Sequence, residues 1–390
     1  MSDSTVLIVG AGIFGATAAW ALVQRGHSVC LLDPGPIPHP KASSTDISKL
    51  IRMDYGEDLF YAELMEASFE GWRHWNTLFD RPMFHEVGAL MLTTEKMQSG
   101  RFESDSYQVL KQRGHPLERM SSRHLSDGFP AWNSKKYTDG YFNPVAGWAE
   151  SGAVTEAIVR FAQAAGVQLV ENCVVESFLE EEGRVTGVMT TDRKPLHADA
   201  VILAAGAWSP AFLPELSQEL WPVALPIMHF RPSDPSLFRP PSFLPWAADI
   251  SRTGWYGFPA NADGILKIAN HGPGVRIDPV KDSRTLHETA EEEARTFFRE
   301  SIPPAADLAF VGGRLCLYCD TFDGDFLITQ HPDRPGLTIA TGGSGHGFKF
   351  APMLGDIIAD VLEAKPNPYA ERFAWRKRSG MKTEQARFDG

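Results

Sequence analysis

The hydrophobic pattern at the start of the chain predicts a strand, a tight turn, a helix and a second strand. Residues 5–9 are a short apolar run, and Gly-Ala-Gly-Ile-Phe-Gly follows at 10–15. An alanine-rich helical stretch then continues to Gly26, a residue type that commonly ends helices. Residues 27–32 form a second apolar run that ends at Asp33. This order is the βαβ arrangement in which a glycine-rich turn has a structural meaning.

Helical and strand patterns continue to alternate along the rest of the chain. Helical periodicity covers 56–82 and 152–166, whereas short apolar runs separated by turns cover 83–149 and 218–320 and indicate antiparallel strands. Further strands are expected at 167–175, 185–189, 200–204 and 337–341. The last of these strands leads into a glycine-rich turn and a helix.

This alternation predicts an α/β fold with two domains (α+β in overall arrangement). We expect a Rossmann-like domain with an inserted substrate domain built on a mixed or antiparallel sheet. The predicted ranges are 1–82, 150–217 and 320–370 for the nucleotide domain, 83–149 and 218–319 for the substrate domain, and 371–390 for a C-terminal tail. The basic residues of the tail indicate a solvated helix end (Arg372, Arg376, Lys377 and Arg378).

The composition is that of a soluble globular protein and narrows the range of partners. Of the 390 residues, 43% are hydrophobic and 22% are charged. The formal net charge of -12 argues against a nucleic-acid or anionic-membrane surface. No apolar run approaches the roughly 20 residues that span a bilayer. Neither a signal peptide nor a peroxisomal Ser-Lys-Leu address is present, so we expect a cytoplasmic protein.

The four cysteines indicate neither a disulfide framework nor a metal site. They are few for a chain of this size. Cys316 and Cys319 form an isolated C-x-x-C, but their neighbours Leu315, Leu317 and Tyr318 are typical of a strand. A zinc site needs further ligands at a matching spacing, and a thioredoxin-like motif opens a helix.

The glycine-rich turn has the spacing of a dinucleotide-binding fingerprint. Gly10 permits the tight turn, Gly12 lets the backbone approach a pyrophosphate, and Gly15 allows the helix to pack closely on the strand. The helix that follows presents its free N–H groups and partial positive charge to the phosphates, and Ile13 and Phe14 are expected to bind the cofactor.

Asp33 strengthens the dinucleotide interpretation. It follows the second strand, where a carboxylate can accept hydrogen bonds from the ribose hydroxyls and repel a 2′-phosphate. NADP is therefore disfavoured, while the fingerprint alone leaves FAD and NAD open.

Several blocks further along the chain resemble one flavoprotein family. The run at 43–58 contains Ile-Arg-x-x-Tyr-Gly-Glu, and other blocks are Tyr-Gly-Phe-Pro at 256–259, Leu-Lys at 266–267, Cys-Leu-Tyr at 316–318 and Ser-Gly-His-Gly-Phe-Lys-Phe at 344–350. In order and spacing they resemble the monomeric sarcosine oxidase and fructosyl amino acid oxidase family of D-amino-acid-oxidase-like flavoproteins. This resemblance extends over about residues 5–360 and implies FAD as the cofactor.

The resemblance also implies roles for the charged and sulfur-bearing residues. Cys316 matches the cysteine whose sulfur is linked to the flavin. Lys267 matches the lysine that lies over the flavin ring and promotes oxygen reduction. Arg52 and Lys349 match the pair that holds the substrate carboxylate, with a planar fork on arginine and a point charge on lysine. Arg52 and Lys349 are expected to lie close to the cofactor as well.

Aromatic and glycine positions complete the site that the resemblance implies. Tyr256, Tyr318, His271 and Tyr55 match positions that shape the substrate pocket. Contacts with the cofactor are expected from the loop and turn residues Ser43, Ser44, Val174, Gly206, Trp208, Gly343, Gly345, His346 and Gly347.

The expected activity is oxidation of the C–N bond of an amino-acid-like secondary amine. An imine would form and hydrolyse to an aldehyde or keto product, with molecular oxygen reduced to hydrogen peroxide. Sarcosine-type and fructosyl-amino-acid substrates remain open, because Lys49 replaces the arginine typical of the sarcosine branch while His271 agrees with that branch. Pipecolate or saccharopine oxidation also remains open, as do an FAD dehydrogenase with another electron acceptor and a non-catalytic nucleotide-binding protein. We expect a monomer.

Overall fold

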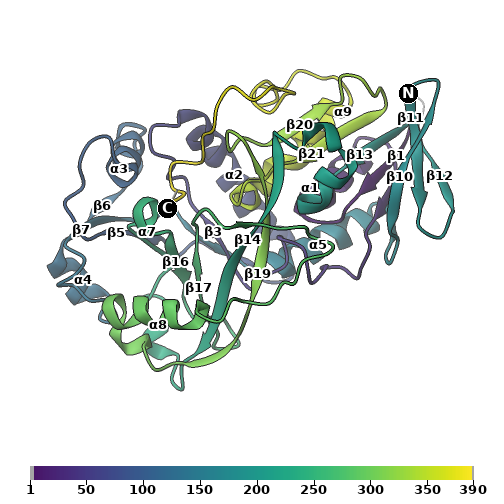
Figure 1. Ribbon diagram of the computed structural model, residues 1–390. Coiled ribbons are helices and arrows are strands. Elements are labelled where there is room, and N and C mark those ends of the chain that lie inside the picture. Colours follow the sequence, from purple (N-terminus) through teal and green to yellow (C-terminus); the bar gives the residue numbers. More distant parts are fainter. Residues whose placement is uncertain (1–3, 389–390) are drawn as a thin grey trace.

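A six-stranded sheet forms one half of the structure, a computed structural model that describes residues 4–388 (Figure 1). Its strand order is β20-β21-β13-β1-β2-β9, and every neighbouring pair is parallel except β20 with β21. The strands are β1 (Thr5–Val9), β2 (Ser28–Leu32), β9 (Gln168–Val170), β13 (Ala200–Leu203), β20 (Leu327–Gln330) and β21 (Leu337–Thr341). Parallel strands are covered on both faces, which explains the continuous apolar run that predicted β1.

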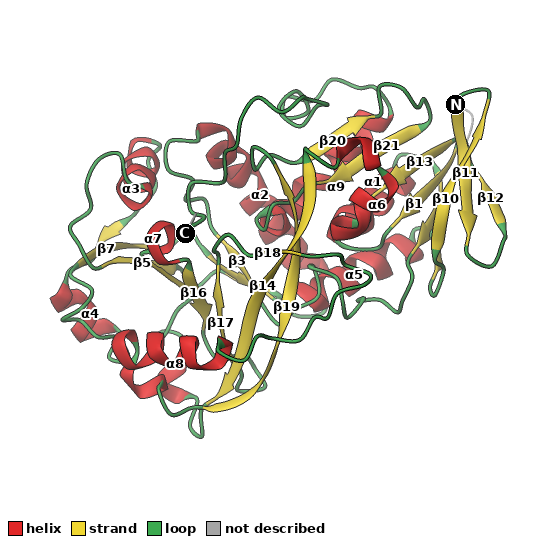
Figure 2. Cartoon of the chain, viewed as in Figure 1, coloured by secondary structure: helices red, strands yellow, loops and turns green. Residues whose placement is uncertain are grey.

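Long helices lie beside this sheet (Figure 2). They are α1 (Ile13–Gln24), α2 (Leu59–Leu78), α5 (Ser151–Ala164) and α9 (Ala351–Leu362). Helix α1 contacts both α5 and α9, and α2 contacts α9. Gly26 follows α1 with a positive φ of 89°, as expected for a glycine that ends a helix. Asp58 caps α2 by accepting a hydrogen bond from the Tyr61 N–H at 3.4 Å.

A small antiparallel sheet extends from the edge of this half at the right of Figure 1. It consists of β10 (Val175–Glu181), β11 (Arg184–Thr190) and β12 (Pro195–His197). Val185 and Val188 of β11 are buried against the core beneath the six-stranded sheet, so the hairpin is part of this half.

A nine-stranded sheet forms the other half, at the left of Figure 1. Its main path is β18-β14-β17-β16-β15-β5-β7-β6, and β19 pairs with β14. The strands are β5 (Ala89–Thr93), β6 (Glu118–Arg119), β7 (Asp139–Asn143), β14 (Leu220–Arg231), β15 (Trp246–Ala248), β16 (Trp255–Phe258), β17 (Leu266–Asn270), β18 (Val275–Arg276) and β19 (Ala309–Thr321). Only the β15–β5 pair is parallel among these pairings.

Shorter helices cover this half and the connections. They are α3 (Phe102–Gln112), α4 (Ser122–Gly128), α6 (Ser209–Phe212), α7 (Ile250–Thr253) and α8 (Ala290–Ser301), with 3₁₀ turns at Gly206–Trp208, Pro214–Leu216, Ser236–Phe238, Pro303–Ala305 and Gly347–Phe350. Phe297 and Phe298 of α8 enter a core that also contains Phe230 of β14. Within residues 4–388, no helix combines the length and apolarity needed to cross a bilayer.

A third sheet connects the two halves through β3 (Lys49–Ile51), β8 (Gly147–Ala149) and β4 (Phe84–His85). Strand β3 carries Lys49 at its start and leads directly to Arg52. The pairing of β3 with β8 therefore fixes the backbone next to Arg52.

The main elements agree with the sequence pattern, whereas some short helices were missed. The predicted strands at β1, β2, β13, β19 and β21 are confirmed. Helices α3 and α4 lie in 83–149, and α8 lies in 218–320, two stretches that we predicted as strands. These helices have apolar positions on one face only, so their short apolar runs resemble strands. The six-stranded sheet draws its strands from separate stretches of the chain, and we retain the domain ranges given above as a proposal.

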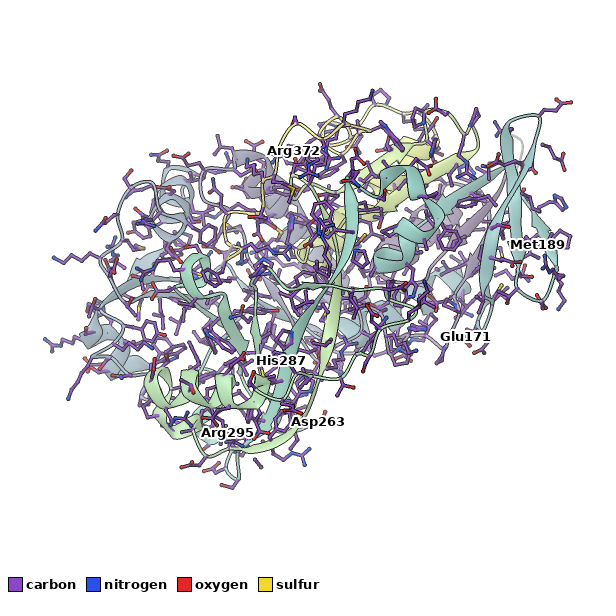
Figure 3. The ribbon with its side chains drawn as sticks, viewed as in Figure 1. Glu171, Met189, Asp263, His287, Arg295 and Arg372 are labelled. Carbon is purple, nitrogen blue, oxygen red and sulfur yellow. The ribbon has the colours of Figure 1, made fainter. Side chains whose placement is uncertain are left out.

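The prediction of a solvated helix end is wrong, because no helix forms there and Arg372 and Arg376 are packed, although Lys377 and Arg378 are exposed as expected. No regular helix is present between residues 363 and 388. The Arg372 guanidinium, labelled in Figure 3, pairs with Asp58 at 2.5 Å and with Asp325 at 2.9 Å. Arg376 pairs with Asp323 at 2.6 Å. These acidic partners come from distant loops, which the local charge pattern does not reveal.

Candidate active site

The main pocket lies at the carboxyl ends of the parallel strands, where doubly wound sheets commonly bind ligands. It contains about 1720 Å³ of empty space, including its opening to solvent. Its lining includes most of the predicted cofactor-binding residues: Gly10, Gly12, Ile13, Phe14, Asp33, Ser43, Ser44, Val174, Gly206, Trp208, Gly343, Gly345 and Gly347. We call this cavity the nucleotide pocket.

The glycine turn leaves room and hydrogen-bond donors for a phosphate group. Gly10 has a φ of 104°, and a Cβ built on it would lie 2.5 Å from the Ala204 carbonyl oxygen. Helix α1 starts after Gly12 with neither a side-chain cap nor an acidic residue in its first turn. The Ile13 N–H donates to Ser44 Oγ at 2.9 Å, which orders the loop that carries Ser44. An uncapped helix N-terminus of this kind suits the pyrophosphate of a dinucleotide.

Gly15 has a packing position and does not line the nucleotide pocket. A Cβ there would collide with the backbone of Gly10, so only glycine lets α1 approach β1 this closely. This placement agrees with the packing role expected for the third glycine of the fingerprint.

Asp33 lies in the nucleotide pocket at the end of β2. Its carboxylate accepts hydrogen bonds from the Ala11 N–H at 2.8 Å and the Gly35 N–H at 3.1 Å. Burial raises the pKa of Asp33, while these two N–H groups act in the opposite direction. A carboxylate has further acceptor sites, so Asp33 retains capacity for a ribose hydroxyl.

His346 lies behind the nucleotide pocket and not in its lining. Its Nδ1 is 3.0 Å from the Tyr55 hydroxyl, and its Nε2 is 2.9 Å from the Gly324 carbonyl oxygen. Burial lowers the pKa of His346 to about 3, so the ring is neutral at physiological pH. It therefore connects the glycine turn to Tyr55.

Cys316 is buried on β19 next to the nucleotide pocket. Its Sγ lies 3.9 Å from Nζ of Lys49, and Lys49 itself lines the pocket. Cys319 also lines the pocket, where it accepts a hydrogen bond from Thr341 at 3.6 Å, and burial raises the pKa of its thiol to about 12. Among residues 4–388, no group of His, Cys, Asp and Glu side chains has the arrangement of a metal site.

Lys267 lies on β17 in a buried ion pair that the sequence did not predict. Its side chain is 1% exposed and its ammonium contacts the Asp46 carboxylate, which is also 1% exposed. Lys267 also donates to the Ser48 carbonyl oxygen at 2.7 Å. Burial lowers the pKa of Lys267 to about 8, although Asp46 acts to raise it. Burial opposes the charged form of Asp46, but the Lys267 charge holds the pKa of that carboxyl well below its usual range.

The structure brings Arg52 and Lys349 together next to Tyr55. Lys349 Nζ donates to the Tyr55 hydroxyl at 2.9 Å, and the two cationic groups lie 5.2 Å (Arg52) and 4.9 Å (Lys349) from the Tyr55 ring centroid. Arg52 and Lys349 are only 3% and 5% exposed. Burial, followed by the nearby Arg52 charge, lowers the pKa of Lys349 to about 7. The predicted carboxylate-binding pair is therefore a compact, buried cationic cluster.

Tyr256, His271 and Tyr318 form an aromatic group beside this cluster. The His271 ring centroid lies 6.4 Å from that of Tyr256 and 5.9 Å from that of Tyr318. Burial raises the pKa of both tyrosines, so they are neutral hydrogen-bonding groups. Tyr318 also lines the nucleotide pocket, so it connects the pocket to this group.

Glu384 is the residue at this site that sequence reasoning missed most clearly. Its carboxylate lies 2.6 Å from Nη2 of Arg52 and 3.0 Å from Nε2 of His271. Burial disfavours its charged form, yet Arg52 and the His271 hydrogen bond hold the pKa of Glu384 well below its usual range. Glu384 stands in a polar stretch of the C-terminal tail with no local motif, so only tertiary contacts reveal its place.

Comparison with known proteins gives matches over most of the chain. The family model described as FAD dependent oxidoreductase matches residues 5–361. A monomeric sarcosine oxidase from Bacillus sp. (strain B-0618) is 26% identical over 359 residues, covering 91% of each chain. An N-methyl-L-tryptophan oxidase from Salmonella heidelberg (strain SL476) is 28% identical over 363 residues, covering 92% of this chain and 95% of that one.

Solved structures of related oxidases share the fold of this chain. The fructosamine oxidase Amadoriase II from Aspergillus fumigatus, in complex with FSA, has a TM-score of 0.85 and 27% identity. The match covers 100% of this chain and 94% of that chain. A modified fructosyl peptide oxidase from Aspergillus nidulans, at 23% identity and a TM-score of 0.87, shares the fold.

Proposed function

Because the chain belongs to the family of FAD-dependent oxidoreductases, we propose that it oxidises the C–N bond of an amino acid that carries a secondary amine. The observation that carries this proposal is the buried cationic cluster of Arg52 and Lys349 beside the nucleotide pocket. Two buried cations within one small site are costly without an anion, which Glu384 provides to Arg52, and the carboxylate of an amino acid is an anion of the same kind.

The nucleotide pocket has features that suit FAD. The start of α1 provides a site for phosphates and the carboxylate of Asp33 a site for a ribose, while Gly10 lets the turn pack on the backbone of Ala204. When bound, FAD supplies the two-electron oxidation of the C–N bond, which leaves an imine for water to hydrolyse and passes the electrons to oxygen as hydrogen peroxide. The protein binds, orients and charges the reacting groups.

The substrate side of the site orients the amine. Arg52 offers a planar fork to a carboxylate, and Lys349 adds a second positive charge when it is protonated. The neutral ring groups of Tyr256 and Tyr318 form the adjacent wall, where an uncharged amine is favoured over an ammonium next to these cations.

We assign the promotion of oxygen reduction to Lys267. Its ammonium is buried at 1% exposure and held charged by Asp46, so it provides a fixed positive charge in a medium of low dielectric. Lys267→Met should slow reoxidation of the reduced enzyme by oxygen far more than anaerobic reduction by substrate. Equal loss in both half-reactions would contradict this role.

We further propose that FAD is covalently attached through Cys316. The thiol is buried on β19 beside the nucleotide pocket, with its Sγ 3.9 Å from Nζ of the pocket-lining Lys49. After acid precipitation, the yellow colour should remain in the wild-type pellet and move to the supernatant for Cys316→Ser. Cys319→Ser, a matched change in the same strand, should keep the colour in the pellet. Free flavin from the wild-type protein would rule out the linkage.

The substrate class is tested by anaerobic titration with sarcosine, pipecolate and a fructosyl amino acid. Bleaching of the flavin by one of them would assign the class, and hydrogen peroxide formed per turnover would distinguish an oxidase from a dehydrogenase. A fructosyl amino acid is the second candidate, since the Amadoriase II fructosamine oxidase shares 27% identity and nearly full coverage. If none of the three bleaches the flavin, the proposed substrate class is wrong.

A further inference from the structure

The C-terminal segment 382–388 places a carboxylate on the cationic cluster. Glu384 is 4% exposed, and its two carboxylate oxygens contact Arg52 at 2.6 Å and His271 at 3.0 Å. We propose that Glu384 is an internal occupant of the substrate-carboxylate position, which the substrate must displace from Arg52. Glu384 would then be a residue that determines substrate affinity and specificity. This inference rests on the proposed role of Arg52 in binding the substrate carboxylate.

The contact on Arg52 has the chemistry of a bound amino acid. The guanidinium donates through Nη2 to Glu384 and through Nη1 to the Asp54 carbonyl oxygen. Both terminal nitrogens of the arginine fork are therefore engaged. A substrate carboxylate that uses the same fork competes directly with Glu384.

Hydrogen bonds and an ion pair hold the segment on both sides of Glu384. The Lys382 N–H donates to the Phe322 carbonyl oxygen at 2.8 Å, and the Phe388 N–H donates to the His271 carbonyl oxygen at 3.0 Å. Arg387 pairs with Asp320 at 2.7 Å. Figure 1 shows this C-terminal chain in yellow, running from the side of α9 towards α7. Because these bonds flank Glu384 directly, withdrawal of its carboxylate from Arg52 would loosen them on both sides.

Further contacts place the segment against predicted site residues. The Gln385 side chain accepts from the Glu57 N–H at 3.2 Å, next to the Tyr55-Gly56 turn. The Arg387 guanidinium lies 5.7 Å from the Tyr318 ring centroid. The segment therefore covers the substrate side of the site and not an unrelated surface.

Charge balance explains why an internal carboxylate belongs here. Arg52 and Lys349 are buried, and a buried charge without a partner is strongly destabilising. Glu384 compensates Arg52 while no substrate is present, and an incoming carboxylate provides the same compensation. The exchange keeps Arg52 paired throughout. Amines without a carboxylate provide no such replacement, so the device selects amino acids over simple amines.

The experiment measures binding of acetate to the full-length FAD-loaded protein by isothermal titration calorimetry. Acetate carries the carboxylate but no amine, so it binds without turnover. Glu384→Gln keeps the size of the side chain and one acceptor oxygen but removes its charge. We expect acetate to bind about tenfold tighter to this variant, the factor expected when the occupied form outnumbers the free form by about ten to one.

Two further variants make the result specific. Glu371→Gln removes the same charge from an exposed position in the C-terminal chain and should leave acetate affinity unchanged. Arg52→Met should weaken acetate binding strongly. If Arg52→Met has no effect, the proposed carboxylate site fails and this inference fails with it. If Arg52→Met weakens binding but Glu384→Gln leaves it within twofold or weakens it, only the displacement of Glu384 is refuted.

Hydrogen exchange provides a second readout that does not depend on a variant. Saturating acetate should speed exchange at the Lys382 and Phe388 amides of the wild-type protein, because release of Glu384 loosens the bonds on both sides. Unchanged or increased protection of this segment with acetate bound would overturn the inference.

Discussion

The buried pair of Asp46 and Lys267 gives a quantitative prediction about stability. Both side chains are 1% exposed, so Asp46→Asn removes the compensating charge without opening the site to water. Burial already lowers the pKa of Lys267 to about 8. Without the carboxylate, its pKa must fall further, because the one neighbouring charge that raises it most is gone.

The size of the effect follows from the Coulomb attraction. Two unit charges at about 4 Å attract by about 4 kcal/mol at an effective dielectric constant of 20, which is about three pKa units. The pKa of Lys267 in Asp46→Asn should therefore fall from about 8 to roughly 5. Linkage then gives a loss of stability relative to the wild type of about 3 kcal/mol at pH 5.5, about 1.4 kcal/mol at pH 7 and nearly none at pH 9.

The direction with pH is the decisive part of this prediction. A lysine whose pKa is lower in the folded than in the unfolded state binds more protons when unfolded, so stability rises with pH between the two values. In Asp46→Asn this interval extends to lower pH than in the wild type. The deficit is therefore largest in acid and disappears above the wild-type folded pKa of about 8.

The assay is differential scanning calorimetry at a fixed scan rate, at pH 5.5, 7 and 9. An unfolding entropy of about 2.1 cal/mol/K per residue gives about 0.8 kcal/mol/K for 390 residues, so the midpoint should fall by about 4 °C at pH 5.5 and about 2 °C at pH 7. Asp263→Asn, an exposed position labelled in Figure 3, is the control and should show no shift at any pH. A gap that is constant with pH, or that widens in alkali, would refute the charge-pair reasoning.

Three further changes probe the nucleotide pocket, the cationic cluster and the C-terminal chain. Gly10→Ala should cost about 2 kcal/mol or more and lower the flavin-to-protein absorbance ratio, since its φ is 104° and its Cβ would lie 2.5 Å from the Ala204 carbonyl oxygen. Wild-type affinity for acetate should weaken as pH rises through about 7, where Lys349 loses its proton, and Lys349→Met should bind more weakly with a flatter profile. Arg387→Met should lower the calorimetric midpoint by about 4 °C, because the Asp320 carboxylate loses its buried partner at a cost of about 3 kcal/mol. A full flavin content, an acetate affinity rising with pH, or an unchanged midpoint would contradict these three expectations in turn.

Local signals predicted the nucleotide half of the fold well. The turn at 10–15 and the apolar runs of β1 and β2 are short-range features. A strand buried on both faces needs a continuous apolar run, and a turn at positive φ favours glycine, so a few residues suffice to predict each. The same holds for β19 around Cys316. In the other half, α8 and the helices between β5 and β7 were missed, since apolar residues on one helix face resemble short strands.

Family resemblance supplied the candidate site residues, and the structure supplied their partners. Arg52 and Lys349 were expected together and do converge on Tyr55. The ion-pair partner of Arg52 could not be predicted from the sequence, since nothing near Glu384 in the chain indicates that its carboxylate contacts Arg52.

The sequence by itself determined the βαβ unit, the positions of the main strands along the chain and the residue types available for chemistry. Only the tertiary structure decided how the buried charges are paired: Lys267 with Asp46, and Arg52 with Glu384. The physical reason is the range of the interactions. Helical hydrogen bonding, turn geometry and apolar periodicity act between near neighbours in the chain, whereas a buried ion pair depends on which distant segments meet where water is excluded.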